Sequence, residues 1–255
     1  MPYGILATAL AAAIAGCDDA TRVTGAGGPT PRPSAAVASA DRGSSVNSIL
    51  FPQTAHPYGA SLTTWAERES QWVYGHPLAN NPLLDQTGAD CDENQYDNHV
   101  WFLPRIAGPR VFSGTRTCTI PRHRAIFLEI GAYVNPWPCP DPSFKPAPGQ
   151  SLYEFLRDDA MAFMNGVNRL EVSIDGREIP DVLSYRFTSE QLFTLTGDPT
   201  FSALDACVMG SPQPAVVDGF FMMIKPLSPG EHTIRVFGTD VRGADKTYTY
   251  HLTVL

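Results

Sequence analysis

Two carboxylates occupy positions where helical periodicity predicts an apolar face. Glu69 and Asp159 each fall inside the apolar stripe of a predicted helix, where a solvated helix would not carry a charge. Burial raises the pKa of a carboxyl group, so two such groups beside one cleft could act as general acid and general base, as in glycoside-cleaving enzymes. In the competing structural interpretation each carboxylate pairs with a buried arginine, and Arg68, Arg116 and Arg186 are candidate partners. We favour the structural interpretation and keep the catalytic one as the alternative.

Two tryptophans on the first of these helices are a candidate ligand platform. Trp65 and Trp72 are one heptad apart and therefore lie on the same side of a helix. Aromatic rings in such an arrangement could stack on a sugar, although pairs of this kind more often belong to a core.

A polar loop between residues 80 and 95 carries carboxylates that could bind Ca²⁺. They are Asp85, Asp90, Asp92 and Glu93. Carboxylate oxygens are the hard ligands that Ca²⁺ uses, but the EF-hand spacing is absent and acidic loops are usually only solvated. Ca²⁺ is therefore the one candidate cofactor that the sequence indicates.

Known catalytic and nucleotide-binding motifs are absent from the chain. It has no nucleophile elbow, metalloprotease helix, P-loop or dinucleotide fingerprint, and its six histidines lack metal-ligand spacing. With a formal net charge of −8 and no cluster of Lys and Arg along the sequence, no nucleic-acid partner is expected. These absences favour a non-catalytic role.

Capping signals predict the helices that would position the two carboxylates. The capping-box spacing at Thr64 predicts a helix over residues 65–74, and that at Ser151 predicts one over residues 152–165. A third, shorter helix is predicted over residues 188–195.

The rest of the body reads as strands. Three β-rich runs between residues 217 and 255, separated by Pro, Gly and Asp, predict consecutive antiparallel strands. In the last run the apolar residues alternate with polar ones, as a half-buried strand requires; they are Tyr248, Tyr250, Leu252 and Val254. We therefore expect a mainly β fold, an antiparallel β-sandwich with two or three packed amphipathic helices, as a single domain over residues 49–255. The alternative is two domains that meet in the Pro-rich segment 135–150.

The N-terminal residues resemble an export and anchoring signal. An apolar run that is too short to span a bilayer ends in Ile14-Ala15-Gly16-Cys17, which resembles the lipobox of bacterial lipoprotein precursors, although no Lys or Arg precedes the run. The resemblance implies a signal peptide over residues 1–16, lipidation of Cys17 and a membrane as partner. Residues 17–48 are rich in Gly, Pro, Ala, Ser and Thr and would form a flexible tether. The expected location is the cell envelope, facing the periplasm or the cell surface.

The other cysteines indicate disulfides. They are four, an even number in a chain predicted to be exported, and three pairings are possible. We expect Cys91–Cys118, which would pin the acidic loop to the neighbouring strand, and Cys139–Cys207, which would join two irregular loops. A zinc site is not expected, because no two cysteines have the short spacing that such sites use.

Motifs spread over the body carry a further resemblance. W-x₆-W, N-P-L-L-D-x-T-G-x-x-C, V-W-F-L, D-G-F-F-M-M and P-G-x-H-T-I together resemble a group of exported bacterial proteins of unknown function. The last motif and the strand after it are also similar to bacterial immunoglobulin-like modules. Neither resemblance implies an activity. We therefore expect a lipid-anchored envelope protein that acts as a non-catalytic binding or structural module, with an envelope glycan or protein as its partner. The alternative is a glycan-cleaving hydrolase or lyase that uses the paired carboxylates.

Overall fold

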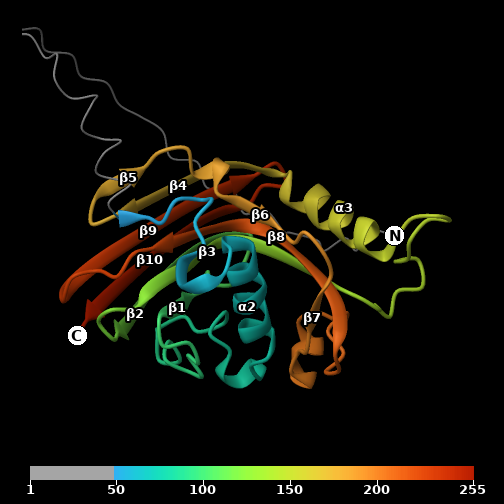
Figure 1. Ribbon diagram of the computed structural model, residues 1–255, viewed down its shortest axis with the longest axis horizontal. Helices are drawn as coiled ribbons and strands as arrows, with labels where there is room; N and C mark the ends of the chain where they lie inside the picture. The colour runs from blue at the N-terminus through green and yellow to red at the C-terminus, as the bar shows by residue number, and fades with distance from the viewer. Residues whose placement is uncertain (1–48) are drawn as a thin grey trace, which may run out of the picture. The chain divides into compact units, whose positions relative to one another are not determined.

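Two β-sheets and two α-helices make up the folded body in the computed structural model, which describes residues 49–255 (Figure 1). Sheet A contains, in spatial order, β1 (Val100–Leu103), β3 (Ala125–Pro136), β8 (Gln213–Ile224) and β6 (Arg186–Thr188), and β7 (Phe193–Leu195) also pairs with β8. Sheet B contains β2 (Val111–Ile120), β10 (Asp245–Val254), β9 (Gly230–Asp240), β4 (Val167–Ile174) and β5 (Arg177–Ile179). Short 3₁₀ turns lie at Pro57–Gly59, Leu78–Asn80, Val182–Ser184 and Pro199–Ala203. The prediction of a mainly β, sandwich-type fold is confirmed.

The alternation along β10 sets the inner face of sheet B. Its apolar side chains are buried and share one core cluster with Leu128 of β3 and Met222 of β8, whereas its intervening threonines and His251 lie on the outer face. This cluster is the main core between the two sheets.

Strands β3 and β8 are covered on both faces. Along β8, Phe220, Met222 and Ile224 belong to the core between the sheets, whereas Phe221 and Met223 belong to a second cluster on the opposite face. A strand that is buried on both sides needs a continuous apolar run, and the sequence from 219 to 224 supplies one.

Strand pairing in the sheets is mixed. β1 pairs with β3 and β2 pairs with β10 in parallel, and the other pairings within residues 49–255 are antiparallel. Parallel pairs need long connections, and here the connections run through other strands of the sandwich. Both sheets combine strands from before and after the Pro-rich segment 135–150.

Helix α2 (Leu62–Tyr74) covers the outer face of sheet A. The prediction of Thr64 as its cap was wrong, because the side chain of Ser61 accepts the hydrogen bond from the Thr64 amide and the helix begins at Leu62. Its buried residues pack against Phe102, Phe127 and other members of the second cluster.

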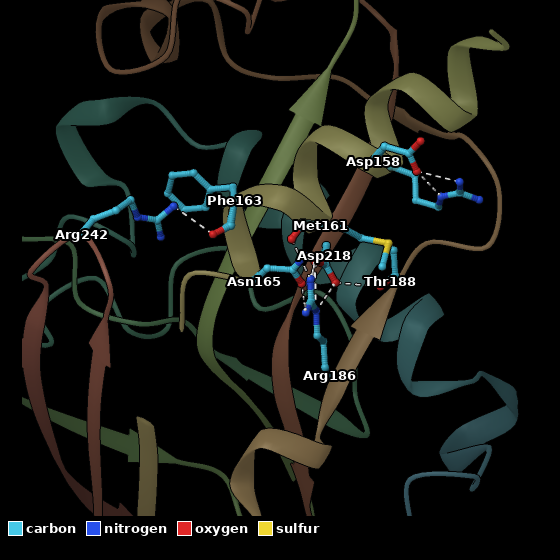
Figure 2. A network of polar contacts seen from close by, with 9 residues as sticks. Asp158, Met161, Phe163, Asn165, Arg186, Thr188, Asp218 and Arg242 are labelled. Carbon is cyan, nitrogen blue, oxygen red and sulfur yellow. Dashed lines mark hydrogen bonds and ion pairs between the residues drawn. The ribbon is translucent and has the colours of Figure 1, made fainter. Parts of the chain in front are cut away.

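Helix α3 (Leu152–Met164) packs on the other face of sheet A, beside sheet B (Figure 1). The predicted capping box of Ser151 and Glu154 is present. At the other end, Arg186 donates to the carbonyl of Met161 and Arg242 donates to that of Phe163 (Figure 2). Two cations therefore bind carbonyls of the last turn, beside the backbone bonds that these carbonyls already accept, and complement the helix dipole.

The segment 188–195 is not a helix, in contrast to its prediction. Residues 186–188 and 193–195 form β6 and β7, and both strands pair with β8. The local capping signal at Thr188 is overridden because the hydroxyl of Thr188 donates instead to Asp218 of β8, at 2.7 Å.

Both predicted disulfides are present. Cys91–Cys118 joins the polar loop to β2. Cys139–Cys207 joins the segment that precedes α3 to the segment that follows β7. Disulfides of this kind are compatible with an exported protein. The predicted signal peptide, Cys17 and the tether lie outside the described residues. Within residues 49–255 no helix has the length and apolarity to cross a membrane.

Candidate functional site

The structure places Glu69 and Asp159 on opposite faces of sheet A. Glu69 belongs to α2 and interacts with Glu129 of β3, whereas Asp159 belongs to α3 and accepts a hydrogen bond from Asn135 of β3, at 3.0 Å. Glu129 and Asn135 are six residues apart, which is roughly 20 Å along a strand. Glycoside hydrolysis needs two carboxylates about 5 to 10 Å apart in one cleft. The predicted acid–base pair is therefore not formed.

Glu69 is part of a buried carboxyl pair. Only 2% of Glu69 is exposed, and burial, the charge of Glu129 and a hydrogen bond with Glu129 all raise the pKa of its carboxyl well above the usual range. Glu129 is held in turn by Arg105, whose Nε lies 3.0 Å from its Oε1 and whose amide donates to its Oε2. The buried Glu69 carboxyl therefore favours its protonated form more strongly than an exposed glutamate does, and it lies next to the ion pair of Glu129 and Arg105.

Asp159 has a structural role at the other face. The Asn135 amide group that donates to Asp159 also donates to the carbonyl of Leu156, and so fastens one turn of α3 to β3. Burial raises the pKa of Asp159, although the hydrogen bond from Asn135 acts in the opposite direction. The arginine partners that the sequence suggested bind elsewhere: Arg186 pairs with Asp218.

The predicted tryptophan platform is not present, because both rings lie in the core. Trp65 is fully buried and donates its indole N–H to the carbonyl of Pro57, at 3.0 Å. Trp72 is 4% exposed and donates to the carbonyls of Glu93 and Asn94. Both rings contact Phe102 of β1, so they stabilise α2 against sheet A.

The acidic loop uses its first carboxylate to organise its own backbone. Oδ1 of Asp85 accepts hydrogen bonds from the amides of Thr87 and Gly88, and Oδ2 accepts one from Asp90. These bonds outweigh the effect of burial and lower the pKa of Asp85. Asp85, Asp90, Asp92 and Glu93 form no group that could hold a metal ion, and neither do other His, Cys, Asp or Glu residues in the part of the chain described.

A buried arginine fixes this loop against sheet B. Arg116 is 1% exposed and donates to the carbonyls of Pro82, Asp85 and Pro104. Gly88 approaches the backbone so closely that a Cβ there would lie 1.9 Å from the Thr117 carbonyl oxygen. Together with the Cys91–Cys118 disulfide, these contacts give the loop a structural role.

The best candidate for a binding site is a cleft of about 480 Å³ between the two sheets, beside the C-terminal end of α3. Clefts of this size accommodate small ligands. Apolar side chains from both sheets line it, among them Ile130, Phe220, Leu170, Val236 and Tyr248. We call it the inter-sheet cleft.

The cleft opens because the inward-facing residues of sheet B change along the strands from large apolar side chains to a lysine and a glycine. On β10 the buried series that includes Leu252, Tyr250 and Tyr248 reaches Lys246, and on β9 the series of Ile234 and Val236 reaches Gly238. A charged residue and a glycine at these positions cannot fill the space between two sheets as the preceding apolar residues do.

A bulge in β3 shapes the opposite wall. The pairing with β8 shifts between Glu129 and Gly131, so that Ile130 and Gly131 both line the cleft. A Cβ on Gly131 would have no neighbouring atom within 4 Å. The other described glycines with this much space around the Cβ position have a positive φ, but Gly131 does not. Neither backbone conformation nor a close neighbour requires glycine here, and its missing side chain leaves the cleft open.

Cations surround the cleft. Arg105, Arg110, Arg242 and Lys246 contribute to its lining, with Asp240 as the single carboxylate among the lining residues. The cluster as a whole was not predictable from the sequence, because its members are widely separated along the chain. The one local signal was the alternation of β10, which places Lys246 on the inner face with Tyr248.

Burial and the charges of Arg105 and Arg110 lower the pKa of the Lys246 ammonium. The positive charges of the cleft are thus close enough to oppose one another. An anion bound among them would relieve this repulsion.

Comparisons with known proteins give no family. The chain matches no protein-family model and no curated protein. Two solved structures align with part of it: the solution structure of amebosin, at 14% identity and a TM-score of 0.19, and the crystal structure of the cysteine protease inhibitor EhICP2 from Entamoeba histolytica, at 13% identity and a TM-score of 0.22. Each alignment covers 58% of this chain and 100% of the other. At these TM-scores the likeness supports no statement about fold or function.

Proposed function

We propose that this chain is an exported, lipid-anchored protein of the cell envelope whose folded body binds a ligand without chemical change, in the inter-sheet cleft. The observation that carries the proposal is the cleft itself, with its apolar walls and the space left open at Gly131. The glycan-cleaving alternative would need Glu69 and Asp159 in one cleft, and it has no support from their placement on opposite faces of sheet A.

Binding in the cleft can be tested by filling it. Gly131→Phe would place a ring in the open space without backbone strain, whereas Leu204→Phe adds a ring at an exposed position outside the cleft. The probe is the uncharged dye phenylnaphthylamine, which fluoresces in apolar surroundings. Wild type and Leu204→Phe should bind it saturably, and Gly131→Phe should bind it at least about tenfold more weakly, a loss of ~1.4 kcal/mol, with an unchanged melting temperature. Equal binding by Gly131→Phe, or no binding by the wild type, would exclude the cleft as the site.

The anchoring part of the proposal rests on the resemblance of residues 14–17 to a lipobox and on the two disulfides, which are compatible with export. Cells that express the protein should incorporate labelled palmitate into the wild type but not into Cys17→Ser. The Cys91→Ser/Cys118→Ser double variant is the control and should keep the label, because these two cysteines lie outside the lipobox and pair with each other. Label in Cys17→Ser at the wild-type level would refute anchoring at this cysteine.

A further inference from the structure

The inter-sheet cleft carries positive charge that the protein does not balance. The formal net charge of the chain is −8, yet four cations and one carboxylate line this cleft. Arg105 pairs with Glu129 and Arg242 pairs with Asp240. Neither Arg110 nor Lys246 forms an ion pair within residues 49–255.

Neutral carbonyl groups hold these two cations in place. Lys246 Nζ donates to the carbonyl of Gly108 at 2.7 Å and also to that of Pro109, and Arg110 donates to the carbonyl of Arg242. These bonds orient the charges without neutralising them. An ammonium has three donors and a guanidinium five, so both side chains keep donors for a further acceptor.

Arg242 is also held in place, in its case with Asp240 as the counter-charge. Its guanidinium carbon lies 3.8 Å from the centre of the Phe163 ring, and one of its nitrogens donates to the carbonyl of Phe163 (Figure 2). Its Nε donates to Asp240. Phe163 is 43% exposed and lines the cleft. The rim of the cleft is therefore cationic and preorganised, while Ile130, Phe220 and Tyr248 make its interior apolar.

We propose that the inter-sheet cleft selects amphiphilic small molecules with an anionic head group, such as a carboxylate, sulfonate or phosphate, which Lys246 and Arg110 bind while the apolar part contacts Ile130 and Phe220. The inference rests on the proposed function, since it names the ligand class of the same site. Charge complementarity supports it, because an anion supplies the partner that both cations lack.

The test uses two dyes that differ by one group. Anilinonaphthalene sulfonate is phenylnaphthylamine with an added sulfonate, so a variant that affects only the first dye reveals recognition of the anion. Arg110→Gln/Lys246→Gln removes the two charges and keeps hydrogen-bond donors at both positions. Lys145→Gln/Arg177→Gln makes the same change in net charge at two exposed residues that do not line the cleft.

Arg110→Gln/Lys246→Gln should weaken binding of the sulfonate dye at least about tenfold, or ~1.4 kcal/mol, and change that of the uncharged dye less than about threefold, or ~0.7 kcal/mol. Lys145→Gln/Arg177→Gln should change neither, and all variants should keep the wild-type melting temperature. Equal weakening of both dyes, or of neither, would overturn the selection of anions while leaving the cleft as a binding site. Loss of binding to phosphatidylglycerol vesicles without any effect on the sulfonate dye would also overturn it, because the cations would then contact a membrane surface.

Discussion

Nε of Arg105 lies 3.0 Å from Oε1 of Glu129, and this ion pair lies between the inter-sheet cleft and the buried carboxyl of Glu69. Arg105 lines both the cleft and a small cavity on the α2 side of sheet A that also contacts Glu69 and Glu129. The ion pair of Arg105 and Glu129 therefore connects the inter-sheet cleft on one face of the sheet with the buried Glu69 carboxyl on the other.

Replacement of Glu69 by glutamine should flatten the pH dependence of stability. Burial, reinforced by the charge of Glu129, raises the pKa of Glu69 in the folded state, whereas the unfolded chain releases this proton near pH ~4.3. The unfolded state then binds fewer protons, so the free energy of unfolding falls as the pH rises from about 4.3 toward the folded pKa, by up to ~1.4 kcal/mol per pH unit. Glu69→Gln cannot lose a proton, and its amide can donate to Glu129. Urea denaturation between pH 5 and 8 should show the decrease in the wild type and in the exposed control Glu178→Gln, but not in Glu69→Gln. A parallel decrease in all three proteins would show that Glu69 is not the source of the pH dependence.

The ion pair of Arg186 and Asp218 should be the most sensitive polar contact of the fold. Asp218 is fully buried and accepts hydrogen bonds from Arg186 Nε and Nη2 and from Thr188 (Figure 2). Asp218→Asn would leave the guanidinium without its counter-charge, and we expect a loss of about 3 kcal/mol in the free energy of unfolding.

The matched control for this prediction is Glu171→Gln, which breaks an exposed ion pair with Arg169. It should cost at most about 1 kcal/mol, because solvent screens the pair. Urea denaturation of both variants measures the difference, and losses of equal size would contradict the prediction.

Each disulfide should contribute through the loop that it closes. Cys91 and Cys118 are separated by 27 residues, and Cys139 and Cys207 by 68. Restriction of the unfolded chain predicts a loss of about 2 to 5 kcal/mol when either pair is replaced by serines, with the larger loss for the longer loop. Peptide mapping without reduction should recover Cys91 linked to Cys118 and Cys139 linked to Cys207. Wild-type stability in either double variant would contradict a contribution from that bridge.

Elements with a complete local signal were predictable from the sequence. The alternation of β10 identified its buried face, the capping box at Ser151 identified the start of α3, and the cysteines gave both pairings. The first two signals are each contained in a few neighbouring residues. The disulfide pairing had to be chosen from only three possible pairings of four cysteines. The apolar stripe likewise identified Glu69 as a buried carboxyl.

Properties that depend on tertiary contacts were not predictable. The partner of Glu69 is Glu129, from another element, and nothing in either local pattern pairs them. The segment 188–195 became two strands because β8 offered hydrogen bonds to both. The cationic cleft arises from residues that come from five separate places in the chain, and the glycine that keeps it open lies within a bulge that only the pairing of β3 with β8 reveals.

The parallel pairing of β2 with β10 also determines when the sandwich can be completed during synthesis. β10 lies between β2 and β9 in sheet B, and β2 has no other partner among the strands described. Residues 111–120 therefore leave the ribosome long before the strand that binds their edge, and β3 likewise precedes β8. Because both sheets depend on such distant contacts, folding of the sandwich must follow translation of residues 245–254 rather than accompany the emergence of its first half.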